Sequence, residues 1–84
     1  MITGTSLRIL LLLNKKQGLE TCSNEGIQDD LNIEEYEFRN AEFALAESNM
    51  ISASKSDTCI SDKGRVELSA YLKQELILFH KTLF

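Results

Sequence analysis

The segment from Leu7 to Leu13 is apolar at six of its seven positions. Thr5 or Ser6 can cap a helix over Leu7–Lys16, and Gly18 can end it. On a helix, these apolar side chains cover most of the circumference instead of one stripe, as in helices that are buried on two sides. We therefore expect one side of this helix to pack in the domain core and the other against something beyond it.

The length of 84 residues predicts one small domain, 1–84. Such a chain buries only about 60–65% of its unfolded surface, so a second subunit would add useful stability. The apolar run Ile9–Leu13 has five residues and no basic segment before it. This run is too short for a membrane span of about 20 residues, and it lacks the features of a signal peptide. We expect a cytoplasmic protein without a membrane partner.

Residues that could support catalysis or metal binding are sparse. His80 is the single histidine, and 36 residues separate Cys22 from Cys59. Neither a CxxC pair nor a zinc site follows from that spacing, and isolated glycines do not form a phosphate-binding loop. We expect no enzymatic activity, no cofactor and no metal.

Two more helices are predicted before the middle of the chain. Ser23 or Asn24 can cap a short second helix, in which Ile27 and Leu31 point inward at a spacing of four. A third helix is expected from about Glu34 to Ser48 and ends where Asn49 can adopt the left-handed conformation.

The pattern then changes to that of a two-stranded hairpin. Ile51 and Ala53 precede a polar turn over 54–57, and Cys59 and Ile60 follow it. A last helix is expected from Lys63 to about Leu83, with Gly64 as a weak position in its first turn.

Three segments resemble the winged helix-turn-helix superfamily. They are 22–33 with its Ser-opened helix and apolar turn, the Phe38, Ala41 and Leu45 pattern, and 59–68, which is similar to the Leu-Thr-x-x-Gly segment of MarR-like and PadR-like regulators. Asn32 and Asn49 stand where the superfamily usually has glycine. The small phage-associated YjcQ-type proteins share the phenylalanine and alanine pattern.

The resemblance implies a mainly α fold with a small β-hairpin, in the order α-α-α-β-β-α. It also implies transcription regulation by a third helix that enters the DNA major groove, with Tyr36, Arg39, Asn40 and Phe43 as its contacts.

The charge distribution opposes that mode of binding. The segment from Glu20 to Glu47 has nine acidic residues and one base, a charge of −8, whereas the rest of the chain carries +4. DNA affinity depends largely on phosphate neutralisation by Lys and Arg. Lys55, Lys63 and Arg65 near the hairpin are either backbone contacts of a wing-led DNA complex or ordinary solvated charges.

Two functional hypotheses follow. In the first, a non-enzymatic module uses the outward face of the third helix, with Tyr36, Arg39, Asn40 and Phe43, to bind a protein. The alternative is a regulator that binds double-stranded DNA through this helix and the basic wing. One ring, that of Phe43, can instead fold back under the last helix.

The last helix has two apolar lines. Leu68, Leu72, Leu76, Phe79 and Leu83 form one, and a thinner line lies on the far side. Together with the apolar first helix, this pattern predicts a twofold homodimer. The predicted interface residues are Ile9, Leu12, Leu13, Val66, Ala70, Ile77 and Phe84.

Overall fold

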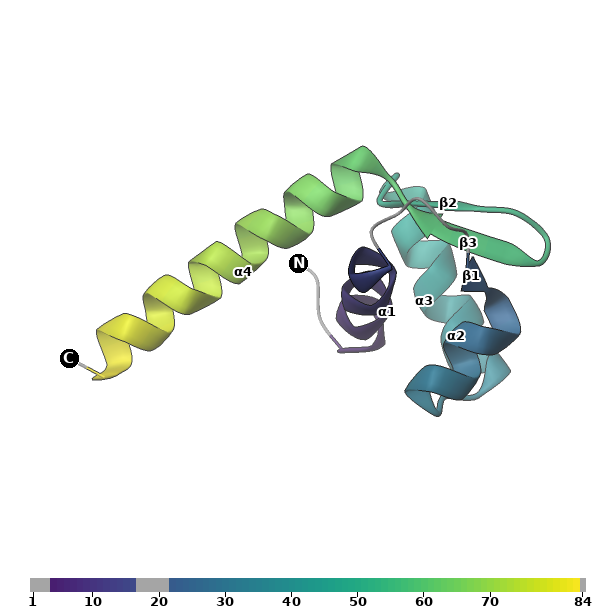
Figure 1. The fold of residues 1–84 in the computed structure, drawn as a ribbon, viewed down its shortest axis with the longest axis horizontal. Coiled ribbons are helices and arrows are strands. Elements are labelled where there is room, and N and C mark those ends of the chain that lie inside the picture. Colours follow the sequence, from purple (N-terminus) through teal and green to yellow (C-terminus); the bar gives the residue numbers. More distant parts are fainter. Residues whose placement is uncertain (1–3, 17–21, 84) are drawn as a thin grey trace.

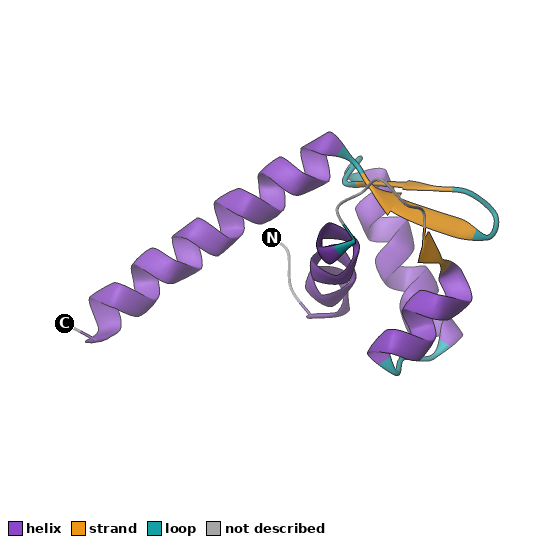
Figure 2. Ribbon diagram, viewed as in Figure 1, coloured by secondary structure: helices purple, strands orange, loops and turns teal. Residues whose placement is uncertain are grey.

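The structure is a computed structural model that describes the backbone of residues 4–16 and 22–83, with side chains described up to residue 76. In this part of the chain, four helices accompany a small antiparallel sheet that lies at one edge of the molecule (Figures 1 and 2). The elements are α1 (Gly4–Lys15), β1 (Cys22–Ser23), α2 (Asn24–Leu31), α3 (Glu35–Glu47), β2 (Ile51–Ala53), β3 (Asp57–Ile60) and α4 (Asp62–Leu83). The predicted mainly helical fold with a small sheet is confirmed, and the architecture is compatible with a winged helix.

Helix α1 is the central element of the core. It contacts α2, α3, α4 and β3, and Figure 1 shows it between α4 and the pair α2 and α3. Ile9, Leu10 and Leu13 are fully buried, and Leu12 is partly buried against the core. The expectation that one side of this helix faces something beyond the domain is wrong, because helices of the same chain cover both sides. Leu11 is the large apolar residue of α1 that stays exposed.

The ends of α2 and α3 follow from local side-chain chemistry. The Ser23 hydroxyl accepts a hydrogen bond from the Gly26 amide at 3.0 Å, which caps α2 as predicted. Asn32 ends α2 with a φ of 54°, and Asn49 follows α3 with a φ of 61°. Asparagine tolerates this left-handed conformation better than most residues, so it can replace the expected glycine at both turns.

The sheet has one strand more than predicted. Its order is β1-β3-β2, and both pairs are antiparallel. The additional strand, β1, pairs Cys22 with Thr58, in a segment where we expected only an extended link. Thr58 and Cys59 point to opposite faces of β3, so the half-buried Cys22 and Cys59 lie on opposite faces of the sheet.

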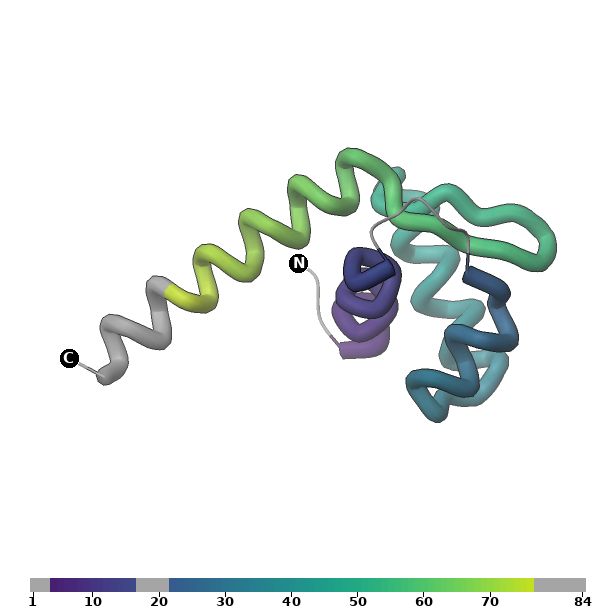
Figure 3. Tube along the Cα trace, viewed as in Figure 1, coloured from purple at the N-terminus to yellow at the C-terminus, as the bar shows by residue number. Residues whose placement is uncertain are grey.

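Helix α4 begins close to the chain segment that enters β2. The Ser61 hydroxyl donates to the Asn49 carbonyl oxygen at 2.7 Å and accepts from the Gly64 amide at 3.0 Å. A Cβ atom at Gly64 would overlap the Met50 carbonyl oxygen. From this junction α4 leads away from the other elements (Figure 3), and the longest dimension of the molecule is 46 Å against 24 and 21 Å for the others.

Gly64 therefore allows a close approach, and we expect Gly64→Ala to lower the free energy of unfolding by about 2 kcal/mol or more. The Met50 oxygen also accepts from the Ser61 amide at 3.0 Å, so it does not move freely to relieve the overlap. This cost exceeds the gain of about 1 kcal/mol in helix propensity. Urea unfolding measures the effect. Ser69→Ala, at an exposed position of the same helix, is the control and should change stability by less than about 0.5 kcal/mol.

Candidate functional site

The outer face of α3, defined by Tyr36, Arg39, Asn40 and Phe43, is exposed along its whole length. Tyr36 and Phe43 are 70% and 69% exposed, which is high for aromatic side chains. The opposite side of α3 buries Phe38, Ala41 and Leu45 in the core, as predicted from the helical period. The alternative in which Phe43 folds under the last helix is thus wrong.

Arg39 is held by carboxylates of its own helix. Its Nη1 lies 3.2 Å from Glu42 Oε1, and its Nη2 lies 3.8 Å from Glu35 Oε1. The guanidinium carbon also lies 5.8 Å from the centre of the Phe38 ring. These contacts compensate the one positive charge of α3 within the helix, at a surface where four carboxylates are present in the same thirteen residues.

The three bases predicted near the wing do not form one group. Lys55 is exposed in the turn between β2 and β3, whereas Lys63 and Arg65 belong to the first turns of α4. The Lys63 ammonium donates to the Ser48 carbonyl oxygen at the end of α3, at 2.9 Å, and Arg65 is half-buried. Only Lys55 of these three lies on the hairpin.

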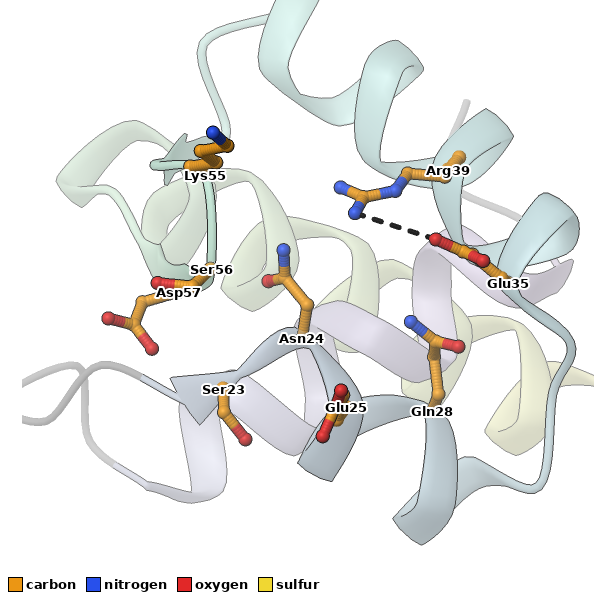
Figure 4. Close-up of a pocket in the computed structure, with 9 residues that line it drawn as sticks. All are labelled: Ser23, Asn24, Glu25, Gln28, Glu35, Arg39, Lys55, Ser56 and Asp57. Carbon is orange, nitrogen blue, oxygen red and sulfur yellow. Dashed lines mark ion pairs between the residues drawn. The ribbon is translucent and has the colours of Figure 1, made fainter.

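A cleft of about 480 Å³ separates the hairpin from α2 and α3 (Figure 4). It is lined by Ser23 and by Asn24, Glu25 and Gln28 of α2, by Glu35 and Arg39 of α3, and by residues 55–57 of the hairpin. Sequence reasoning missed this cleft because its walls come from three segments that are distant in the chain. Asn24 was recognised only as a possible helix cap.

Asn24 and Thr58 form a buried polar contact at the base of the cleft. The Thr58 hydroxyl donates to Asn24 Oδ1 at 2.8 Å, and Glu42 Oε2 lies 3.3 Å from the same hydroxyl. The backbone N–H of Asn24 also donates to the Ser56 carbonyl oxygen at 2.9 Å. Polar side chains of α2, the hairpin and α3 thus meet at one point.

The residues predicted for a dimer interface fall into different environments. Ile9 and Leu13 are wrong, because both are buried within the domain, and Leu12 is largely covered by it. Val66 and Ala70 are exposed on α4, as the prediction requires. The Ile77 side chain and Phe84 lie outside the described residues.

Exposure increases along the other apolar line of α4. Leu68 is 1% exposed, Leu72 is 43% and Leu76 is 57%. These residues recur at intervals of four and therefore share one side of the helix. The line is covered by the domain at its start and is uncovered where α4 leaves the other helices.

Among the described residues, no group of three or more His, Cys, Asp or Glu side chains is arranged to hold a metal ion. In the same part of the chain, no helix is long and apolar enough to cross a membrane. The His80 side chain lies outside the described residues.

Comparison of the chain with protein-family models, with curated proteins and with solved structures gives no match.

The Thr58 hydroxyl gives the first test of the buried contact. We expect Thr58→Val to lower the free energy of unfolding by about 1–3 kcal/mol, since it leaves the buried Asn24 Oδ1 without its donor. Urea unfolding monitored by circular dichroism measures this change. Ser52→Val removes a hydroxyl from an exposed position of β2 and should alter stability by no more than about 0.5 kcal/mol. Equal effects of the two substitutions would contradict a special role for Thr58.

Proposed function

We propose that the chain is a non-enzymatic, dimeric winged-helix regulatory module that acts mainly through protein–protein contacts of α3. The observation that carries this proposal is the exposure of Tyr36 and Phe43 beside Arg39. Tyr and Arg are enriched among the residues that dominate protein interfaces. A partner that covers exposed aromatic rings removes apolar surface from water, which stabilises the complex.

The partner that fits this face has a basic surface with an apolar patch. Glu35 and Glu47 are exposed on α3, and the segment from Glu20 to Glu47 carries −8. Complementary charge would speed association and orient the partner. The apolar patch would cover Tyr36 and Phe43.

Dimerisation is proposed through the uncovered part of the α4 line. Leu72 and Leu76 continue a line that already packs inside the domain at Leu68. A second copy of the chain presents the same apolar residues. A twofold axis can pack the two sets against each other, because each set is the complementary surface of the other. A chain with a core this small would gain stability from the apolar area that such a contact buries.

DNA binding is the alternative, and two observations favour it. The architecture is compatible with a winged helix, and Asn40 and Lys55 are exposed on α3 and the hairpin. Against it, Arg39 is compensated by Glu35 and Glu42, and Lys63 is engaged with Ser48. The helix that would enter the major groove therefore offers no uncompensated base to neutralise phosphates.

A titration of fluorescent duplex DNA at low salt distinguishes the two functions. We expect no submicromolar binding, because the acidic α2–α3 region repels the duplex. Submicromolar binding that weakens steeply as salt rises, and that is lost in Arg39→Glu or Lys55→Glu, would contradict our proposal and support the DNA alternative.

The α3 face is tested by the double substitution Tyr36→Ala and Phe43→Ala. We expect it to weaken direct binding of a purified basic partner by at least about tenfold, since two exposed rings leave the interface. The partner is isolated with the intact chain and then titrated by calorimetry. Leu11→Ala, which truncates a residue of α1 with 40% exposure, is the control and should bind as the unaltered chain does. Unchanged affinity in the double variant would exclude this face as the binding surface.

Sedimentation equilibrium tests the dimer. At high micromolar concentration we expect twice the 9.5 kDa mass of one chain. Leu72→Glu combined with Leu76→Glu should give monomers, since it places charges in an apolar contact, whereas Gln74→Glu on another side of α4 should leave the dimer intact. A mass of one chain for the unaltered protein would rule the dimer out.

A further inference from the structure

The cleft between α2, α3 and the hairpin carries an inference of its own. Figure 4 shows the Arg39 guanidinium and the Asn24 side-chain nitrogen directed toward the same space, and Lys55 lines this space from the hairpin. All three groups are hydrogen-bond donors. Within the described part of the chain, Lys55 forms no hydrogen bond or ion pair, and Arg39 retains N–H groups beyond those directed at Glu35 and Glu42.

Asn24 is the most specific of these donors. It is only 5% exposed, and the Thr58 hydroxyl holds its Oδ1 at 2.8 Å. In this arrangement Nδ2 faces the cleft, and it has no hydrogen-bond partner among the described residues. A buried donor without a partner is costly, so the site is prepared for an acceptor such as a carboxylate.

The charges of the lining indicate a ligand with both signs. Besides Lys55 and Arg39, the cleft is lined by the carboxylates of Glu25, Glu35 and Asp57. A purely anionic ligand would be repelled by the three carboxylates. A purely cationic ligand would leave the hydrogen-bond donors of the cleft without an acceptor. A molecule that carries a carboxylate and an ammonium group a few bonds apart uses both sets.

We propose that this cleft binds a free α-amino acid. Its carboxylate accepts hydrogen bonds from Asn24 Nδ2, Lys55 and Arg39, and its ammonium group faces Glu25 and Glu35. The volume of about 480 Å³ leaves room for an amino-acid side chain toward the opening. This binding goes beyond the protein contacts proposed for the outer face of α3, with which the cleft shares Arg39.

Nuclear magnetic resonance of the ¹⁵N-labelled full chain tests the proposal. The probes are glycine, L-glutamine and L-lysine, with acetate, methylammonium and inorganic phosphate as single-sign controls. We expect at least one amino acid to shift the Asn24 side-chain NH₂ signals saturably, with an affinity at least about tenfold higher than that of acetate or methylammonium.

Lys55→Ala is the variant that tests the site, because Asn24→Ala would also remove the acceptor of Thr58. We expect Lys55→Ala to weaken amino-acid binding by about tenfold, through loss of a charge-assisted hydrogen bond, without changing the remaining spectrum. Lys73→Ala, at an exposed position of α4, should bind as before.

Three outcomes would overturn the proposal: no saturable shift with any amino acid, equal binding of acetate, or unchanged affinity in Lys55→Ala. Preferential binding of phosphate would overturn it as well, and would indicate a contact for a nucleic-acid backbone instead.

Discussion

The hydrogen bond from Thr58 to Asn24 fixes the arrangement on which the surfaces of this domain depend. The apolar core joins α1, α3 and α4 through side chains such as Phe38 and Leu68, but apolar contacts have little directional preference. The Thr58–Asn24 bond is directional and buried, and its partners are 34 residues apart. The backbone N–H of Asn24 also donates to the Ser56 carbonyl oxygen. Together the two hydrogen bonds set the distance of the hairpin from α2 and therefore the width of the cleft.

The same contact reaches the exposed side of α3 through Glu42. One of its carboxylate oxygens lies near the Thr58 hydroxyl, and the other lies 3.2 Å from Arg39. Because Glu42 is largely buried, its side-chain position is restrained, and so is that of the guanidinium. Exposed ion pairs usually contribute little to stability. Here the pair has another consequence, since it holds Arg39 beside two carboxylates and between two exposed aromatic rings.

Local signals in the sequence predicted most of the elements, and contacts between distant segments account for what was missed. Ser23, Asn32 and Asn49 act within a few residues of their own position, so the caps and turns could be read directly. The period of Phe38, Ala41 and Leu45 likewise identified the buried side of α3.

Features that depend on contacts between distant segments were predicted less well from the sequence. The apolar circumference of α1 indicated burial on two sides correctly, but periodicity does not say whether the covering helix belongs to the same chain. Strand β1 forms only because β3 offers it a partner. Lys63 and Arg65 follow the hairpin closely in sequence, yet α4 begins at Asp62 and carries both away from it. The cleft required the position of Asn24 relative to Lys55 and Arg39, which no local pattern contains.

Arg39 belongs both to the outer face of α3 and to the lining of the cleft, and this links the two proposed binding events. A carboxylate in the cleft would compete with Glu35 and Glu42 for the guanidinium. The pair with Glu35 is the one to yield, because its atoms are 3.8 Å apart and the Glu35 side chain is 73% exposed. Release from Arg39 would leave the Glu35 carboxylate to the ammonium group of the bound amino acid, so filling the cleft rearranges the charges beside Tyr36. Since such coupling is reciprocal, a partner on α3 that alters the pair of Arg39 and Glu35 would also change the affinity of the cleft for its ligand.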